Sequence, residues 1–376
     1  MDTVTDSTQV HEFPAPVGGA PFPIDFAPSI LFVVLYALLI PVIIWRALDR
    51  RSRTIALLGT ACLAIERVVT FSLRANAALK EGPRESAGLQ TYFQATFGVG
   101  YITMSQDLTN LFRALLVDTT FARAAASGSG DTASTRSHPS IPLVALRSEG
   151  LAVRAPGEGM EGDEEHAMGV KYNMWQRFLT MGNSAWQDGA REDQPRLRKR
   201  LRHIFGLASL VYLTAIVMNV VASVEYRHTV PSGSNSSTIQ VLRKTDGLSL
   251  PCKYRRAASA GIAFVLIGIL TCASAYAIIA LPRVPKIPSL FIVTVAHFLA
   301  LVGCYRLIMA HATTTSLLST AHGSQNTRSE KVAFWVLSAA PEWIAAAILV
   351  SINGRRMFRT GLWGDLNSNK PQPKEL

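Results

Sequence analysis

This chain contains little charge for its length. Only 17% of its 376 residues are Asp, Glu, Lys or Arg, whereas about 25% is usual for a soluble domain. Its four cysteines are too few for a disulfide framework. No Cys/His metal spacing, phosphate-binding glycine loop or protease motif is present. We therefore expect no metal, no cofactor and no enzymatic activity.

Long apolar stretches are what the chain has in abundance. Seven of them run over residues 27–47, 54–73, 89–116, 204–224, 257–281, 289–310 and 332–352. A helix rises about 1.5 Å per residue, so each stretch is long enough to cross the ~30 Å hydrocarbon layer of a bilayer. In that layer the backbone N–H and C=O groups must be satisfied within the segment. The sequence therefore predicts an all-α integral membrane protein, a seven-transmembrane-helix bundle in the plasma membrane or an endomembrane.

The basic residues predict the orientation of this bundle. The first 26 residues contain no Lys or Arg, so a retained signal-anchor is expected rather than a cleaved signal peptide. The short connector after the first stretch is basic, and its arginines are Arg46, Arg50, Arg51 and Arg53. Basic connectors stay in the cytoplasm, which predicts an external N-terminus and a cytoplasmic C-terminus. The acceptor at Asn235 would then be glycosylated outside, although basic residues in the same connector, among them Arg255 and Arg256, oppose this orientation.

Five regions follow from this topology. They are an external tail (1–26), helices one to three (27–117), a long cytoplasmic connector (118–201), helices four to seven (202–352) and a cytoplasmic tail (353–376). The connector is rich in Gly, Ser, Thr and acidic residues, which predicts that most of it is disordered and available to a cytoplasmic protein partner.

A basic cluster ends that connector. It consists of Arg196, Arg198, Lys199, Arg200 and Arg202. Such a cluster attracts anionic lipid headgroups at about 1 kcal/mol per charge, or it acts as a topology signal alone. The formal charge of +11 arises mostly from residues that flank apolar stretches, so we expect the bilayer rather than nucleic acid as the partner.

Ionisable residues inside the apolar stretches are the candidate functional groups. Each costs ~2.5–3.5 kcal/mol or more at membrane depth, so it should face the bundle interior. The candidates are Glu66, Asp107, His297, Arg306 and Glu342. Counting residues from the span ends places Glu66, His297 and Glu342 near the midplane, where they could form a ligand or proton-relay site. Arg67 should pair with Glu66 only through another helix or water, since consecutive helical residues point apart, and Arg74 should snorkel to the interface. Interhelical hydrogen bonding is the alternative role for each.

The third stretch carries a polar stripe. Thr96, Gly100, Thr103, Asp107 and Asn110 recur at steps of three and four residues, which places them on one helix face. A polar face should contact protein rather than lipid, so this helix is expected to be central. In the seventh stretch, Pro341 precedes Glu342 and predicts a kink.

Several short motifs resemble those of fungal (basidiomycete) seven-span membrane proteins. The motifs are Glu66-Arg67, Tyr305-Arg306-Leu307-Ile308, Pro341-Glu342-Trp343 and Gly361-Leu362-Trp363-Gly364-Asp365. More distantly, the set is similar to the fungal lipid-translocating exporter (RTA-like) family. The resemblance covers about residues 27–365 without most of the long connector, and it implies the handling of lipids or toxic compounds.

The topology also resembles that of G-protein-coupled receptors, but the Asp/Glu-Arg-Tyr and Asn-Pro-x-x-Tyr motifs are missing. Three functions remain open. The first is a receptor or sensor, the second is a transporter or lipid translocator that uses the midplane carboxylates, and the third is a structural membrane protein without its own ligand.

Overall fold

The computed structural model describes residues 12–49, 52, 54–121, 194–229, 238–281 and 283–360. Most of the predicted connector, the Asn235 acceptor and the 361–365 motif lie outside the described residues.

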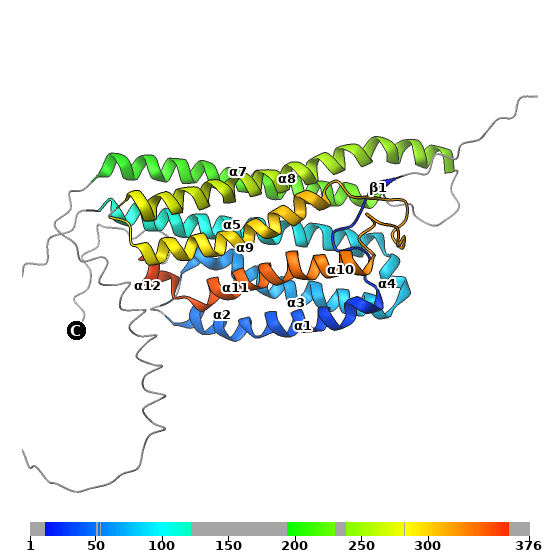
Figure 1. Ribbon diagram of the computed structural model, residues 1–376, viewed down its shortest axis with the longest axis horizontal. Coiled ribbons are helices and arrows are strands. Elements are labelled where there is room, and N and C mark those ends of the chain that lie inside the picture. The colour runs from blue at the N-terminus through cyan, green and yellow to red at the C-terminus, as the bar shows by residue number, and fades with distance from the viewer. Residues whose placement is uncertain are drawn as a thin grey trace, which may run out of the picture. The chain divides into compact units, whose positions relative to one another are not determined.

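The described chain is almost entirely helical (Figure 1). The long helices are α1 (Phe26–Ala37), α2 (Leu39–Leu48), α3 (Leu58–Leu79), α5 (Ala87–Thr119), α7 (Pro195–Thr229), α8 (Thr238–Ala280), α9 (Lys286–Met309) and α11 (Ala340–Ser351). The shorter elements are η1 (Pro23–Asp25), η2 (Ile55–Leu57), α4 (Glu81–Glu85), α10 (Arg328–Phe334), the π-helical η3 (Trp335–Ala339) and α12 (Gly354–Phe358). Two short strands, β1 (Phe13–Pro14) and β2 (Thr313–Thr314), pair antiparallel.

Within the described ranges, five helical segments are long and apolar enough to cross a membrane. They are Pro23–Leu48, Pro195–Thr229, Leu250–Ala280, Lys286–Met309 and Arg328–Ser351. These segments confirm the prediction of a helical integral membrane protein. Two of the seven predicted spans, α3 and α5, are not among them. Their composition gives the reason: α3 carries Glu66, Arg67 and Arg74, and α5 mixes apolar residues with Gln, Thr and Ser.

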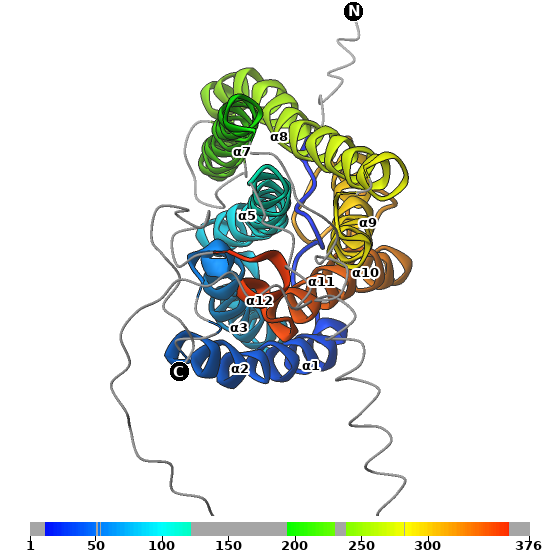
Figure 2. The same cartoon turned by 90° about the vertical axis from the view of Figure 1, so that its left-hand side faces the viewer.

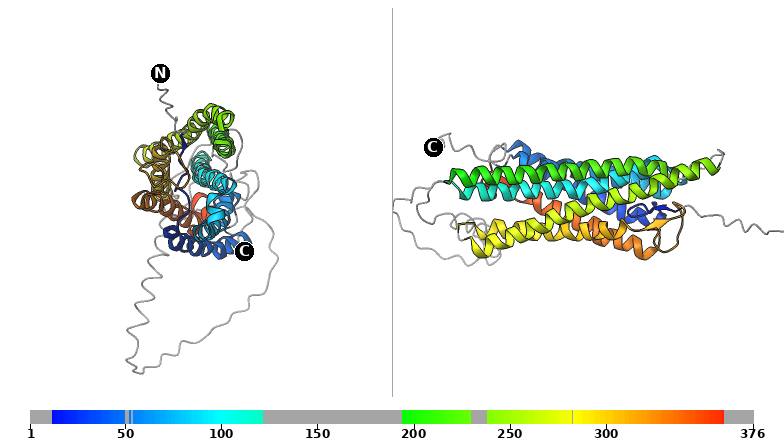
Figure 3. Two further views of the ribbon diagram at one scale, coloured as in Figure 1. Left: turned by 90° about the vertical axis from the view of Figure 1, so that its right-hand side faces the viewer. Right: turned by 90° about the horizontal axis from the view of Figure 1, so that it is seen from above.

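The helices lie side by side, and α5 packs inside the bundle. It contacts α3 on one side, α7 and α8 on another and α9 on a third. Figure 2, viewed along the helices, shows α5 between α7 and α8 on one side and α3 on the other, with α11 between α1 and α9, and Figure 3 shows the same long helices from two further sides. The outer helices expose large apolar side chains such as Leu31, Val217 and Ile279. An apolar exterior around a more polar interior is the arrangement that lipid favours.

An aromatic cluster joins α1, α3, α5 and the η3 region. Phe32 stacks on Phe71 and on Trp335, with both pairs of ring centroids 5.4 Å apart. Phe97 lies 5.8 Å from Phe71 and 5.3 Å from Phe334. Such pairs add about 0.5–1.5 kcal/mol each beyond their burial, so this cluster fixes the helices that carry the candidate site.

One end of the bundle is covered by the segment 12–25, which the sequence predicted only as a tail. Its strand β1 pairs with β2, with Phe13 opposite Thr314. Phe13 and Ala20 are fully buried, and the Ala20 amide donates to Asn326 Oδ1 at 2.9 Å. The segment therefore packs against the bundle together with the α9–α10 connector.

A π-helical turn precedes Pro341. Because proline has no N–H, the carbonyl four residues upstream loses its usual α-helical donor. In the turn before the proline, the Ala340 amide donates to Trp335 O, five residues back, rather than to the carbonyl four residues back as in an α-helix. The sequence predicted a kink at Pro341, and the structure has a π turn directly before this residue, a feature that occurs frequently at functional sites.

Candidate functional site

A buried arginine connects three helices near the middle of the bundle. Arg67, on α3, is fully buried. Its Nε and one terminal nitrogen both lie 2.5 Å from Glu342 Oε1 on α11, and its other terminal nitrogen lies 2.6 Å from Glu66 Oε2. It also donates to the Thr96 carbonyl of α5 at 3.2 Å. One guanidinium thus holds two carboxylates and a backbone oxygen, which satisfies charges that would be costly to bury alone.

The direct contact between Arg67 and Glu66 corrects the sequence prediction. Although consecutive helical residues leave the axis in different directions, the arginine side chain is long and its planar fork presents donors along two edges. One edge faces Glu342 and the other reaches back to Glu66. No second helix is needed for this pairing.

Glu66 differs from Glu342 in its exposure. The Glu342 side chain is 2% exposed, whereas that of Glu66 is 29% exposed. Glu66 Oε1 accepts hydrogen bonds from the Thr70 hydroxyl and from the Tyr92 hydroxyl, the latter at 3.2 Å. Glu66 is therefore the carboxylate of this cluster that a molecule from outside the bundle can reach.

Gly100 provides the room for this arrangement. A Cβ atom added there would lie 2.1 Å from an Arg67 terminal nitrogen and 2.9 Å from Glu342 Oε1. The missing side chain lets the backbone of α5 approach the ion pair. The same approach places the Phe97 ring 5.1 Å from the Arg67 guanidinium carbon, within cation–π range.

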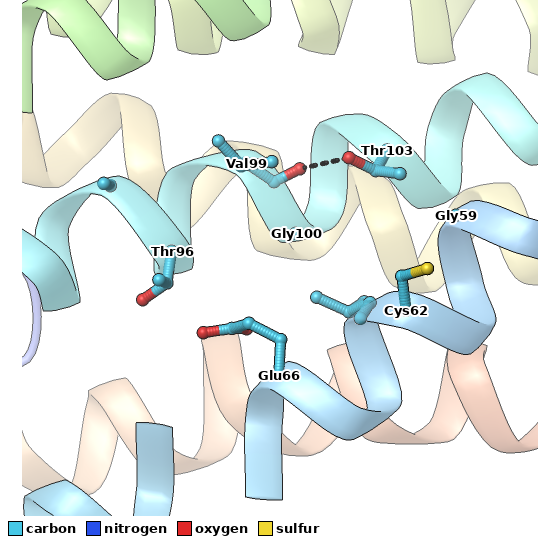
Figure 4. Close-up of a pocket in the computed structure, with 9 residues that line it drawn as sticks. Gly59, Cys62, Glu66, Thr96, Val99, Gly100 and Thr103 are labelled. Carbon is cyan, nitrogen blue, oxygen red and sulfur yellow. Dashed lines mark hydrogen bonds between the residues drawn. The ribbon is translucent and has the colours of Figure 1, made fainter. Parts of the chain in front are cut away.

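A groove between α3 and α5 leads to Glu66. It has a volume of about 280 Å³, and its lining residues are Gly59, Cys62, Leu63, Glu66, Ala95, Thr96, Val99, Gly100 and Thr103. Figure 4 shows Glu66 pointing from α3 toward Thr96 of α5. Small residues on both helices leave this space open. Cys62 is exposed, and Leu58 and Ile65 on the same helix are also exposed, so the groove opens on the apolar surface of the bundle.

The polar stripe of α5 divides between this groove and the helix contacts. Gly100 and Asp107 are buried, whereas Thr96, Thr103 and Asn110 are half-buried. Thr96 and Thr103 line the groove. Their hydroxyls donate to the carbonyls of Phe93 and Val99 on their own helix, as serine and threonine commonly do inside helices.

Asp107 binds the start of α3 and does not join the cluster around Arg67. Its Oδ2 accepts from the Thr60 amide at 2.6 Å and from the Thr60 hydroxyl at 2.8 Å. Thr60 lies in the first turn of α3, whose own N-cap, Leu57, provides no side-chain acceptor. Asp107 therefore caps α3 from a neighbouring helix and places a negative charge at its positive end.

Arg306 lies beside the cluster and His297 does not. Arg306, on α9, is buried and donates to the Phe97 carbonyl at 2.7 Å, close enough to interact electrostatically with Glu342. His297 is exposed on the outer face of α9, where its Nδ1 lies 3.0 Å from Val293 O. The structure thus brings Glu66 and Glu342 together around Arg67, with His297 facing away from them.

The basic cluster at the start of α7 lies on the surface. Arg196, Lys199, Arg200 and Arg202 are exposed. Arg198 is half-buried and donates to the hydroxyl and carbonyl oxygens of Thr120 at 3.2 Å each. Its guanidinium carbon also lies 3.7 Å from the Phe121 ring centroid, so Arg198 ties α7 to the end of α5 while the others face outward.

A second buried ion cluster was not predicted from the sequence. Asp25 Oδ2 accepts from Lys331 at 2.7 Å and from Arg74 at 3.3 Å, and its Oδ1 accepts from the Trp335 indole at 3.2 Å. Arg74 is fully buried and also donates to Gly18 O at 2.5 Å. The prediction that Arg74 snorkels is therefore wrong, because the segment 12–25 supplies its partners inside the protein. The sequence did show two cations, Arg74 and Lys331, next to apolar stretches, which indicates a buried acid as their partner. Nothing in the sequence identified Asp25 as that acid.

Comparisons with protein-family models, with curated proteins and with solved structures find no match to this chain.

Proposed function

We propose that this chain is a seven-span membrane receptor whose ligand enters the α3–α5 groove from the bilayer. In this proposal α3 and α5 also cross the membrane, the N-terminus is external and the C-terminus cytoplasmic. The observation that carries the proposal is the part-exposed Glu66 carboxylate in an apolar groove, joined through Arg67 to Glu342 beside the π turn.

The lengths and places of α3 and α5 support seven spans. Their 22 and 33 residues correspond to roughly 33 and 50 Å at about 1.5 Å per residue. Both run alongside the other long helices (Figure 1). The α2–α3 connector, the start of α7 and α12 lie together at one end, whereas β1, α4 and α10 lie at the other. Successive connectors thus alternate between the two ends of the bundle, as they would in a chain that crosses the membrane seven times.

The groove favours an amphiphilic ligand with a hydrogen-bond-donating or cationic head. An ionised carboxylate in an apolar setting attracts donors strongly, because few water molecules compete for it. The residues around Glu66 are small and mostly apolar, which suits an alkyl chain. A long-chain amine combines both features.

Arg67 offers a route from the groove to α11. It donates to both Glu66 and Glu342, so a cationic head on Glu66 would compete with Arg67 and leave Arg67 more firmly bound to Glu342. Glu342 follows η3 by three residues. A π turn can convert to an α turn by a local shift of hydrogen bonds, which makes it a suitable two-state element for a ligand to bias.

The translocator alternative needs a path across the bundle as well as a site. Segment 12–25 covers one end of the described bundle, with Phe13, Ala15 and Ala20 buried. This cover favours lateral entry and a receptor. The long connector 118–201, with a cytoplasmic protein partner, and the exposed arginines of α7, with anionic lipid, would complete the signalling side.

Protection of Cys62 from alkylation tests the ligand class. Cys62 lines the groove, while Cys272 and Cys304 are exposed elsewhere and Cys252 is buried. In a Cys272→Ala/Cys304→Ala background reconstituted in nanodiscs, we expect hexadecylamine to slow N-ethylmaleimide labelling of Cys62 at least tenfold more than hexadecanol does. Glu66→Gln should remove the difference, whereas Glu85→Gln, at an exposed site on α4, should leave it intact.

Equal protection by the amine and the alcohol, or undiminished protection in Glu66→Gln, would refute the ligand class. Liposome assays of proton-coupled flux and lipid scrambling then separate the two functions. A receptor gives no flux in wild type, whereas flux that is lost in Glu342→Gln would establish the translocator instead.

A further inference from the structure

A polar cavity lies deeper in the bundle, away from the apolar α3–α5 groove. Its volume is about 20 Å³, and its lining residues are Val17, Gln94, Gly98, Tyr101, Asn219, Arg256, Ser259, Ala260, Arg306 and Ala310. They come from the segment 12–25 and from α5, α7, α8 and α9. A cavity of about 10–15 Å³ by this measure suffices for one water-sized occupant, so this one has room for a single small species.

The charge of this cavity is not balanced by the described protein groups. Arg256 and Arg306 are both more than nine-tenths buried. Arg306 has Glu342 nearby, and the arginine–carboxylate cluster around Arg67 is then neutral, with two cations and two anions. The ionisable neighbours of Arg256 are Cys252 and Tyr226, which are neutral near pH 7. Among the described residues, therefore, no carboxylate compensates Arg256.

The donors of the cavity are also incompletely used. Tyr101, Ser259 and Asn219 donate to the backbone carbonyls of Ala260, Ala215 and Ala95. By contrast, the buried Gln94 Nε2 and Arg306 Nε have no partner among the described residues.

A hydrogen bond to its oxygen fixes the orientation of the Gln94 side-chain amide. Gln94 Oε1 accepts from the Val17 amide at 3.1 Å, so its nitrogen is the atom left to donate. Arg256 uses one terminal nitrogen on Ala15 O at 3.2 Å. Unpaired buried donors cost about 1–3 kcal/mol each, and a buried charge costs more unless it is paired.

We propose that this cavity is a binding site for one small monovalent anion of chloride size, held by Arg256, Arg306 and Gln94. The anion accepts hydrogen bonds from the unused N–H groups and neutralises Arg256. A water molecule would use the same donors but would leave the charge in place. Segment 12–25 closes the site through Val17 and Ala15, so anion binding stabilises the packing of that segment on the bundle. The anion does not depend on the ligand proposed for the α3–α5 groove, although Arg306 also lies near Glu342.

Thermal unfolding of the purified full-length protein in detergent tests the site. Tryptophan fluorescence would be followed in sodium chloride and in sodium gluconate at equal ionic strength, since gluconate is too large for the cavity. We expect the unfolding midpoint to rise by a few degrees for each tenfold increase in chloride above its dissociation constant. Bromide should replace chloride, and gluconate should not.

Three variants locate the effect. Arg256→Gln removes the uncompensated charge and should abolish the chloride response. Arg255→Gln is the matched control, because Arg255 pairs with Glu225 at a part-exposed site, and it should keep the response. Gln94→Glu retains an acceptor for Val17 and supplies a carboxylate to the cavity. Its unfolding midpoint in gluconate should equal that of wild type in chloride, and chloride should not raise this midpoint further.

Identical wild-type midpoints in chloride and gluconate would refute the anion and leave water as the occupant. A chloride response that persists in both Arg256→Gln and Gln94→Glu would place the anion elsewhere. Gln94→Glu keeps the test decisive even if Arg256→Gln does not fold, because it adds the missing charge rather than removing one.

Discussion

Substitution of Gly100 by alanine tests the central ion pair. The new Cβ would lie 2.1 Å from the Arg67 terminal nitrogen, whereas an ordinary contact begins at 3.4 Å. The nitrogen must therefore withdraw by more than an ångström. The guanidinium has no free direction, because Glu342, Glu66 and the Thr96 carbonyl already hold it.

Two opposing terms set the size of the effect. Alanine gains up to about 1 kcal/mol over glycine inside a helix. Breaking a buried ion pair costs about 3–5 kcal/mol, because both charges stay buried. The expected net loss for Gly100→Ala is about 2–4 kcal/mol of unfolding free energy.

Gly268→Ala is the matched control. Gly268 lies in α8, and a Cβ there meets nothing within 4 Å, so this variant should be neutral or slightly stabilised. Unfolding in mixed micelles with increasing SDS, followed by tryptophan fluorescence, measures both variants against wild type. If Gly100→Ala unfolds at the same SDS fraction as Gly268→Ala, rather than at a much lower one, then α5 does not pack closely against Arg67.

Three further predictions follow from the described contacts and the proposed topology. Asp107→Leu should destabilise the protein by about 1–3 kcal/mol in the same SDS titration, since the Thr60 amide loses its acceptor; Asp107→Asn, which keeps an acceptor, should cost less. Asp25→Asn removes the carboxylate shared by two buried cations and should lower stability by about 3–5 kcal/mol, with faster proteolysis within 12–25; unchanged cleavage there would contradict the role of this cluster. With the N-terminus external, Asn235 should carry a glycan, and endoglycosidase should shift the wild-type band but not that of Asn235→Gln; a band insensitive to the enzyme would favour the opposite orientation.

Hydrophobic length predicted the parts of the fold that lipid dictates. The first predicted span, 27–47, corresponds to the segment Pro23–Leu48, and the sixth, 289–310, to Lys286–Met309. A bilayer requires these lengths, so composition alone reports them. The kink predicted at Pro341 has a similarly local cause, the missing N–H, and the structure has a π turn directly before this residue.

Contacts between distant helices were beyond sequence reasoning. Counting residues predicted a depth for His297 but not its direction around α9, and the side chain faces outward. The partner of Lys331 is Asp25, 306 positions away, and no periodicity relates them. Depth follows from a single helix, whereas the pairing of charges depends on how several helices pack together.

The two predicted spans that fall short of the apolar criterion are the ones that carry the candidate site. Hydropathy treats every helix as if lipid were its only neighbour. For α3 the relevant neighbour of Arg67 is Glu342 of α11, and for α5 the neighbour of Asp107 is the start of α3. A helix whose charges are paired inside the bundle needs an apolar face only where lipid touches it. The polar residues of α3 and α5 therefore reflect the faces that these helices turn toward their neighbours in the bundle, and this composition is compatible with their crossing the membrane.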